Sequence, residues 1–479
     1  MELDWRVCSR ARLARDARFD GKFYIGVHST RIYCRPICHS RASREENVCY
    51  FSTAAAAAAA GFRPCLRCRP ESSPGTPAWA GTKTTVARAL RLLNESSLEE
   101  GGVEALADHL GVGSRHLRRL FLRHLGATPR DIAQTRRLHF AKKLIDETRL
   151  PMTQIALASG FGTVRRFNAA IREVYDRTPT QIRALARQQP LAAENQYEFR
   201  LGFRRPYSWP YIFQFLAVHA ARGIEIVEGG CYRRTISVKG NEGFLEVLAD
   251  EARDELRVRV QIGDPALLFA IIERVRAMFD LDADWSIVEK TLQADPLLAA
   301  KLAADPGRRV VGCFDGFELT VRAILRQRSR QLELAPQLAG IVETFGRPYS
   351  PAEHLTHVFP TPQELCDAPL ESLGVLQAHA DSIRAVARAA CSGRIAFDRI
   401  ADTAEFLRAL ADCPGVGAQT IGYVAMRALR DTDAFPMTLS ELKRVLGVAD
   451  PRAVRQRALS WRPWRAYAAV YLSPSPGAR

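Results

Sequence analysis

The chain has 479 residues, more than one hydrophobic core can organise, so we expect three or four domains. Its composition, 47% hydrophobic and 25% charged, is typical of a globular protein. It shows no apolar run long enough to cross a bilayer and no apolar secretory signal at its start, so we expect a cytoplasmic protein with no membrane partner. Residues 1–190 carry 32 Lys and Arg against 17 Asp and Glu, whereas the remainder is nearly neutral. The basic part is therefore expected to bind a polyanion such as nucleic acid.

Four of the eleven cysteines have the spacing of metal ligands. Cys34 and Cys38 form a C-x3-C pair in YCRPIC, and Cys65 and Cys68 form a C-x2-C pair in PCLRC. Four thiolates on two short knuckles match a tetrahedral structural zinc site, and zinc binding would stabilise so short a segment. We predict one Zn²⁺ held by all four. The other cysteines are interpreted as isolated, small, buried hydrophobic residues: Cys8, Cys49, Cys231, Cys313, Cys366, Cys391 and Cys413.

The segment RFDGKFYIGVHSTRIYCRPICHSR, with GFRPCLRCRPE after it, resembles the N-terminal domain of the bacterial Ada methylation-response family. The resemblance implies that Cys34 is both a zinc ligand and a nucleophile that takes a methyl group irreversibly from a DNA methylphosphotriester. Arginines around the site, Arg35 and Arg67 among them, are expected to attract the DNA backbone. A purely structural zinc knuckle is the alternative, because spacing alone does not show reactivity.

Composition divides the chain into four predicted domains. Polar stretches at 71–82 and 188–196 indicate linkers, and strand-like alternation gives way to helical periodicity near 305–309. The predicted domains are a zinc and methyl-acceptor domain, a helix-turn-helix domain, an α/β domain and a helical domain, at residues 1–72, 83–187, 199–308 and 309–479.

Residues 111–129 and 160–179 repeat a Gly-x-Gly turn, a Ser or Thr helix cap and a basic amphipathic helix. Two such units indicate tandem helix-turn-helix motifs, whose second helices enter the DNA major groove. The whole block resembles the AraC-type regulator domain, which implies binding to a promoter operator, transcription activation and RNA polymerase as a partner. Arginine and asparagine suit the reading of guanine and adenine. The predicted DNA-binding residues are Arg118, Arg119, Arg165, Arg166 and Asn168.

The C-terminal half resembles AlkA-type 3-methyladenine DNA glycosylases. PYSWPYIFQFLAVHAARGIEIVEGGCYRRTISV is similar to their N-terminal α/β domain, and VGCFDGFELTVRAILRQ and SWRPWRAYAAVYL are similar to their helical catalytic domain. LADCPGVGAQTIGYVAMRAL reads as a helix-hairpin-helix, in which Gly415 and Gly417 let backbone N–H groups approach a DNA phosphate. The expected fold class is multidomain α and α+β: a small four-cysteine zinc domain, an all-α tandem helix-turn-helix, an α/β AlkA N-terminal-like domain and an all-α helix-hairpin-helix domain.

This half departs from the glycosylase pattern at its active site. Leu439, in DAFPMTLSELK, stands at the place of the family's catalytic aspartate; Asp433 lies well upstream, and Glu441 would face another side of a helix. Two aromatic positions read Gln419 and Ser473, whereas Tyr423 is kept as a pocket candidate. Arg328 replaces an apolar DNA-wedging residue. Because base excision needs a stacking pocket and charge stabilisation, we expect impaired glycosylase activity.

The leading hypothesis is a DNA alkylation-damage response protein that repairs methylphosphotriesters by self-methylation at Cys34 and regulates transcription, with double-stranded DNA, both alkylated and operator, as its partner. One alternative is an active 3-methyladenine glycosylase with an attached regulator, which release of methylated base would favour. Another is a zinc-stabilised DNA-binding regulator without chemistry, which failure of Cys34 to gain a methyl would favour. No Pro-Cys-His-Arg motif occurs, so repair of the methylated guanine oxygen is not expected.

Overall fold

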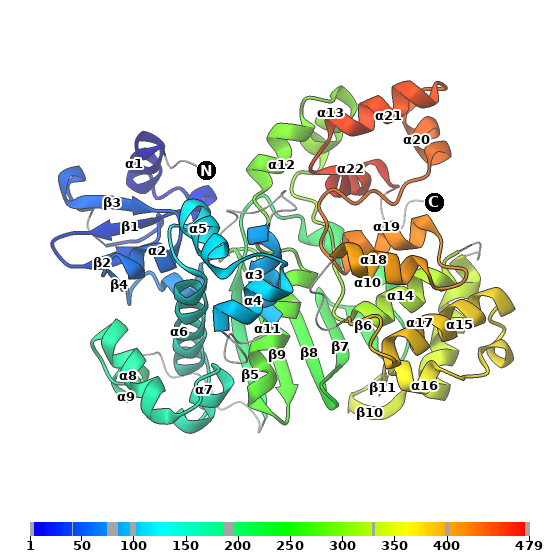
Figure 1. Cartoon of the computed structure of the whole chain (residues 1–479), viewed down its shortest axis with the longest axis horizontal. Coiled ribbons are helices and arrows are strands. Elements are labelled where there is room, and N and C mark those ends of the chain that lie inside the picture. The colour runs from blue at the N-terminus through cyan, green and yellow to red at the C-terminus, as the bar shows by residue number, and fades with distance from the viewer. Residues whose placement is uncertain are drawn as a thin grey trace. The chain divides into compact units, whose positions relative to one another are not determined.

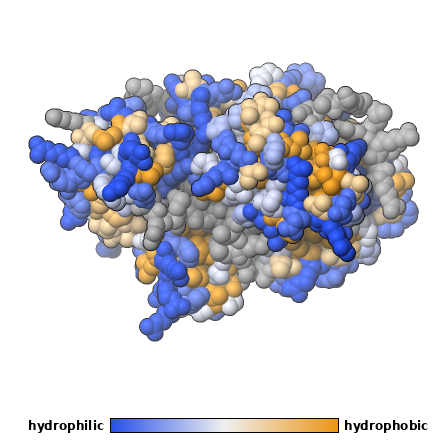
Figure 2. All heavy atoms as spheres, turned by 90° about the horizontal axis from the view of Figure 1, so that it is seen from above, coloured by the Kyte–Doolittle hydropathy of each residue, from blue (hydrophilic) through white to orange (hydrophobic). Residues whose placement is uncertain are grey.

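The computed structural model describes residues 4–40, 42–73, 85–95, 102–185, 195–327, 331–397 and 403–474. Arg328 and most of both predicted linkers lie outside these ranges. The chain divides into two compact units: the first comprises 1–205, 250–273 and 281–283, and the second 206–249, 274–280 and 284–479. None of the described helices is long and apolar enough to cross a membrane. Hydrophilic residues cover much of the face in Figure 2, with hydrophobic residues interspersed.

The first unit begins with a small sheet flanked by helices. The sheet order is β3-β1-β2-β4, with β1 antiparallel to β2 and β3, and β2 parallel to β4. Successive strand residues point to opposite faces, so Tyr24 enters one core with Tyr33 and Phe62, while Ile25 enters another with Phe23. The elements are α1 (Trp5–Leu13), η1 (Ala17–Phe19), β1 (Tyr24–Val27), β2 (Ile32–Cys34), η2 (Glu45–Asn47), β3 (Val48–Phe51), α2 (Ala54–Ala59), β4 (Arg63–Pro64) and η3 (Pro70–Ser72).

Helices follow in the first unit, and α6 runs between α5 and the α7–α9 group in Figure 1. Residues four apart form one buried stripe on each second helix, from Leu117, Phe121 and Leu125 on α5 and from Phe167, Ile171 and Tyr175 on α8. The helices are α3 (Thr85–Glu95), α4 (Gly102–His109), α5 (Ser114–Leu125), α6 (Pro129–Glu147), α7 (Met152–Ala158), α8 (Val164–Tyr175) and α9 (Pro179–Leu185).

The helix caps of the two repeats differ. Thr163 caps α8, as expected, because its hydroxyl accepts a hydrogen bond from the Arg166 N–H. The expectation that Ser114 caps α5 is wrong: Gly113 is the N-cap, without a side-chain hydrogen bond, and Ser114 is the first helical residue. Gly113 satisfies the backbone geometry of a cap but offers no side-chain acceptor.

The strands that follow are distributed over both units. In the first unit, β5 (Gln196–Gly202) pairs antiparallel with β9 (Glu255–Ile262). In the second, β6 (Glu225–Glu228), β7 (Cys231–Val238) and β8 (Asn241–Asp250) form an antiparallel meander. A short ribbon of β10 (Arg347–Ala352) and β11 (Leu355–Val358) also belongs to the second unit.

The helical core of the second unit gathers around α14, α17 and α19, where Val321, Ile383 and Val424 are fully buried. The remaining elements are α10 (Trp209–His219), η4 (Pro265–Leu267), α11 (Leu268–Met278), α12 (Trp285–Leu292), α13 (Pro296–Ala304), α14 (Gly316–Leu325), α15 (Gln331–Phe345), α16 (Pro362–Leu365), η5 (Leu370–Leu373), α17 (Gln377–Cys391), α18 (Thr403–Ala411), α19 (Ala418–Arg427), α20 (Leu439–Leu446), α21 (Pro451–Ser460) and α22 (Arg465–Leu472).

One pair of the remaining cysteines differs from the expectation of isolated buried residues. Cys391 is exposed, and its sulfur lies 3.1 Å from the sulfur of Cys366. The contact arises where α16 packs on α17, a tertiary relation that spacing along the chain does not reveal.

Candidate functional site

The four predicted metal ligands come together at one edge of the small sheet. Cys34 ends β2, and Cys65 follows β4 directly. Because β2 and β4 are parallel neighbours, their carboxyl ends bring the two knuckles side by side. The sulfur atoms of Cys34, Cys38, Cys65 and Cys68 all lie within 4.8 Å of one another.

The cluster is chemically suited to a soft divalent cation. Hydrogen bonding with Cys34 lowers the pKa of Cys38 and raises the pKa of Cys68, because the crowded sulfurs compete for protons. Four sulfurs this close cannot all ionise without a compensating cation. Four thiolate donors fit Zn²⁺.

Neighbouring groups hold the two knuckles in place. The Arg35 backbone N–H donates to Cys68 Sγ at 3.3 Å, and its guanidinium donates to the Cys68 carbonyl at 3.0 Å. The same guanidinium pairs with Asp20, with Nε 2.8 Å from Oδ1. The Arg35 side chain is only 13% exposed, so it supports the metal ligands from within the fold. Of the two arginines predicted to contact DNA here, Arg67 is the exposed one.

Tyr33, the residue before Cys34, contacts the long helix α6 of the helix-turn-helix region. Its buried hydroxyl lies 2.9 Å from His139 Nε2. Nearby, the Thr53 hydroxyl that caps α2 also donates to the Leu125 carbonyl at the end of α5. The metal knuckle and the paired helices are thus connected by polar contacts.

A buried ionic cluster reinforces this connection. Arg69, directly after Cys68, pairs with Glu71, Asp146 and Glu147 at 3.0–3.2 Å. Burial opposes the charge, but these carboxylates raise the pKa of Arg69. Lys142 pairs with Asp146 at 2.5 Å. The i,i+4 spacing of Lys142 and Asp146 is a sequence signal for a pair along one helix, but no sequence signal identifies Arg69 as their partner across the fold.

The predicted DNA-reading side chains lie on the exposed faces of α5 and α8. This face is opposite the buried stripe of each helix, as a groove-entering helix requires. Among them, Arg118 forms an exposed ion pair with Glu104 at 3.1 Å, and such a pair is weak enough to exchange for a phosphate or base. The exposed set is Arg115, Arg118, Arg119, Arg123, Arg165, Arg166, Asn168 and Arg172.

In the second unit, the predicted hairpin joins α18 to α19. Gly415 has φ +78°, and a Cβ there would lie 2.1 Å from Ser382 Oγ, so both backbone and space require glycine. Gly417 is the exposed N-cap of α19, with no side chain shielding the helix end. An exposed helix N-terminus of this kind favours an anion such as a phosphate.

The carboxylates nearest to Leu439 in the sequence, Asp433 and Glu441, both have partners. Leu439 is the first residue of α20, and Glu441 closes its capping box by accepting from the Thr438 N–H at 2.7 Å. Asp433 is buried and accepts from Arg465 at 2.7 Å and from Arg462 at 3.0 Å. Neither carboxylate is available to replace an aspartate at position 439.

The retained aromatic is covered by cations. The guanidinium groups of Arg326 and Arg427 lie 5.6 and 5.0 Å from the Tyr423 ring centroid, and Arg427 lies 4.2 Å from that of Phe215. These cation–π contacts compete with a base for the Tyr423 ring. Gln419 and Ser473 are exposed. No sequence motif signalled the role of Arg427.

Comparisons with known proteins match successive parts of the chain to three families. These are the metal binding domain of Ada at residues 7–71, a helix-turn-helix domain at 106–185 and the AlkA N-terminal domain at 198–315. The "probable bifunctional transcriptional activator/DNA repair enzyme AlkA" of Mycobacterium tuberculosis is 36% identical over 98% of this chain and 96% of its own.

Two Escherichia coli proteins each match one part. DNA-3-methyladenine glycosylase 2 is 29% identical over 57% of this chain and 96% of its own length. The bifunctional transcriptional activator/DNA repair enzyme Ada is 35% identical over 36% of this chain and 47% of its own length. The match to the mycobacterial protein extends over nearly the full length of both chains.

Proposed function

This chain belongs to the family of bifunctional transcriptional activator/DNA repair proteins that join Ada-type zinc-binding and helix-turn-helix domains to an AlkA-type module. We propose that Cys34 accepts a methyl group from a DNA methylphosphotriester and that the methylated protein then activates transcription. The observation that carries the proposal is the position of Cys34. It lies in a four-sulfur cluster at a sheet edge, half-buried, with the exposed Arg31 and Arg67 on the same small domain.

The proposed repair step is a direct methyl transfer. Cys34 Sγ attacks the methyl carbon, the bond from that carbon to the phosphate ester oxygen breaks, and its electron pair stays on the oxygen. The products are a DNA phosphodiester and a methyl thioether, so each chain acts once. Zn²⁺ held by the four cysteines would keep the attacking sulfur ionised at neutral pH, while Arg31 and Arg67 attract the phosphates.

The proposed regulatory step follows from charge. Methylation converts a thiolate into a neutral thioether and removes one negative charge that faces the DNA backbone, so DNA binding strengthens. The arginine-rich exposed faces of α5 and α8 then read the operator. RNA polymerase is the partner that an activator bound there would engage.

For the AlkA-type module we propose DNA binding with impaired base excision. Leu439 cannot stabilise positive charge on the sugar, and Glu441 and Asp433 are held by the N-terminus of α20 and by two arginines. Loss of a catalytic electrostatic group costs about 10²–10³ in rate or more. These contacts disfavour the alternative of an active glycosylase.

The proposal is tested by intact-protein mass spectrometry after incubation with methylated DNA. We expect a gain of one methyl group, mapped to the peptide that contains Cys34, and no gain in Cys34→Ser. Cys49→Ser is the matched control, because Cys49 lies in the same small domain but outside the four-sulfur cluster. A methyl group mapped to another residue, or none with zinc bound, would overturn the proposal.

A further inference from the structure

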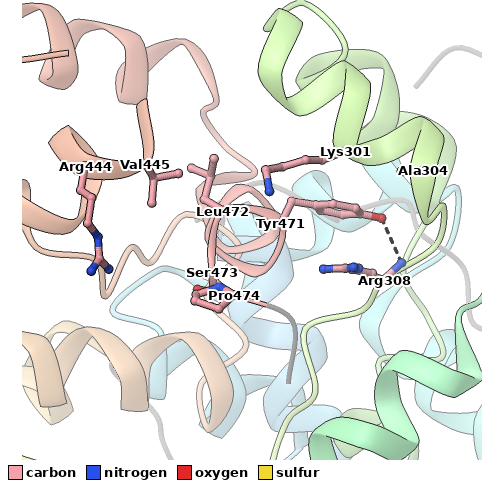
Figure 3. Close-up of a pocket in the computed structure, with 9 residues that line it drawn as sticks. All are labelled: Lys301, Ala304, Arg308, Arg444, Val445, Tyr471, Leu472, Ser473 and Pro474. Carbon is pink, nitrogen blue, oxygen red and sulfur yellow. Dashed lines mark hydrogen bonds between the residues drawn. The ribbon is translucent and has the colours of Figure 1, made fainter. Parts of the chain in front are cut away.

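A pocket of about 570 Å³ opens at the C-terminal end of the second unit. As Figure 3 shows, Lys301 and Arg308 approach it from the Tyr471 side and Arg444 from the opposite side, with Leu472 and Ser473 between them. Its volume lies within the range of about 300–1,000 Å³ typical of ligand sites. We refer to it as the C-terminal pocket.

The C-terminal pocket is positively charged. Among the lining residues that the structure describes, three have cationic side chains and none has a carboxylate. Arg308 pairs with Asp305 at 2.7 Å, just outside the lining, whereas Lys301 and Arg444 have no ion-pair partner among the residues that the structure describes. Like charges around one hollow repel each other, and a bound anion relieves that repulsion.

One wall of the pocket is built before any ligand arrives. The Tyr471 hydroxyl donates to the Asp305 carbonyl at 2.8 Å and accepts from the Arg308 backbone N–H at 3.1 Å. The Arg308 guanidinium lies 5.4 Å from the Tyr471 ring centroid and 4.9 Å from that of Tyr211. Stacking between rings restricts the guanidinium, so little conformational entropy is lost when it binds a ligand.

The remaining lining indicates the class of ligand. The volume exceeds the needs of a lone phosphate, and Ala304, Val445 and Pro474 offer accessible apolar surface beside the cations. A nucleotide combines both chemistries, with a phosphate for the cations and a sugar and base for the apolar wall. Ser473 stands where the glycosylase pattern has an aromatic residue that stacks on a base. Without that ring, the positively charged side chains dominate the lining of the pocket.

We propose that the C-terminal pocket binds the phosphate ester of a nucleotide, contributed by the DNA strand that the AlkA-type module holds. The inference rests on the proposed DNA binding of this module. In this proposal the AlkA-type module contacts a DNA phosphate where the glycosylase family would stack a base on an aromatic ring. The module can then hold DNA without excising a base. A free nucleotide carries the same phosphate ester and is the second possible source.

The test is chemical acetylation of lysines in the full chain, read by mass spectrometry with and without a non-operator DNA duplex. We expect the duplex to reduce labelling of Lys301 several-fold and to leave the exposed Lys290 of the same unit nearly unchanged. Protection should be lost in Arg444→Ala, retained in Arg444→Lys, and retained in Arg455→Ala, which removes an exposed arginine outside the lining.

Parallel samples with thymidine monophosphate distinguish the two sources. Protection by the mononucleotide alone would keep the phosphate-ester chemistry and assign it to free nucleotide. Unchanged labelling of Lys301 with both probes, or equal protection in Arg444→Ala and wild type, would overturn the proposal. Methyl transfer to Cys34, measured on the same protein, does not depend on this pocket. Failure of the methyl transfer assay is therefore distinguishable from failure of the Lys301 protection assay.

Discussion

The hydroxyl of Tyr33 lies 2.9 Å from Nε2 of His139 and joins the strand that ends in Cys34 to the helix that lies between α5 and α8. The Tyr33 hydroxyl is buried and protein surrounds most of the His139 ring, so the loss of either group leaves the other without this hydrogen bond. The strand that ends in the proposed methyl acceptor is therefore bonded directly to α6, the helix between the two predicted DNA-reading helices.

Tyr33→Phe should destabilise the first unit by about 1–3 kcal/mol, because it leaves the His139 nitrogen without its partner. Urea unfolding followed by far-ultraviolet circular dichroism measures the change in the free energy of unfolding. Tyr50→Phe is the matched control, since the Tyr50 hydroxyl bonds the solvent-accessible Glu45. Equal losses in both variants would contradict a special role for the buried contact.

Acid should weaken the same region through His139. Burial, opposed by Glu71, lowers the pKa of His139 to about 4, below the value of about 6.5 expected in the unfolded chain. The unfolded state then binds the extra proton first, so this contribution to stability is complete above pH 6.5 and is lost as the pH falls towards 4.

His139 keeps some exposed area although protein surrounds its ring, so we expect a loss of about 1–2 kcal/mol between pH 7 and 5. Urea unfolding at several pH values measures it. His139→Gln should flatten the dependence, whereas the exposed His124→Gln should keep the wild-type slope. An unchanged slope in His139→Gln would assign the effect to other groups.

Much of the metal site was predictable because ligand spacing is local: two short knuckles define four donors whatever lies between them. The paired helix-turn-helix motifs were predictable because the helical spacing of apolar residues and the Gly-x-Gly turn both occur twice along the chain. The position of Arg35 was not, because its partner Asp20 is set by tertiary packing. The same holds for Arg69 with its carboxylates on α6, for Arg427 over Tyr423, and for Cys391 beside Cys366.

Removing one zinc ligand should remove the metal. We expect one zinc per chain by metal analysis, and less than a tenth of that in Cys65→Ser after dialysis against a chelator, because three thiolates bind far more weakly than a closed set of four. Cys231→Ser, which alters a buried cysteine of the second unit, should retain the full content. Full zinc in Cys65→Ser would exclude it as a ligand.

Wild-type protein should release little 3-methyladenine from alkylated duplex DNA, and Leu439→Asp should increase release about tenfold or more by restoring a carboxylate. The gain is limited by Gln419 and Ser473, which cannot stack a base as a ring does. Leu439→Asn, similar in shape but uncharged, should give no gain. Robust wild-type release that Leu439→Asp leaves unimproved would place the catalytic carboxylate elsewhere.

The most direct test of the central claim compares the DNA affinity of the chain before and after methylation of Cys34, at one fixed salt concentration. Loss of one negative charge facing the phosphates should tighten specific binding about tenfold or more, and Cys34→Ser treated in the same way should show no change. Equal operator affinity for the methylated and unmethylated chains would contradict a methylation switch.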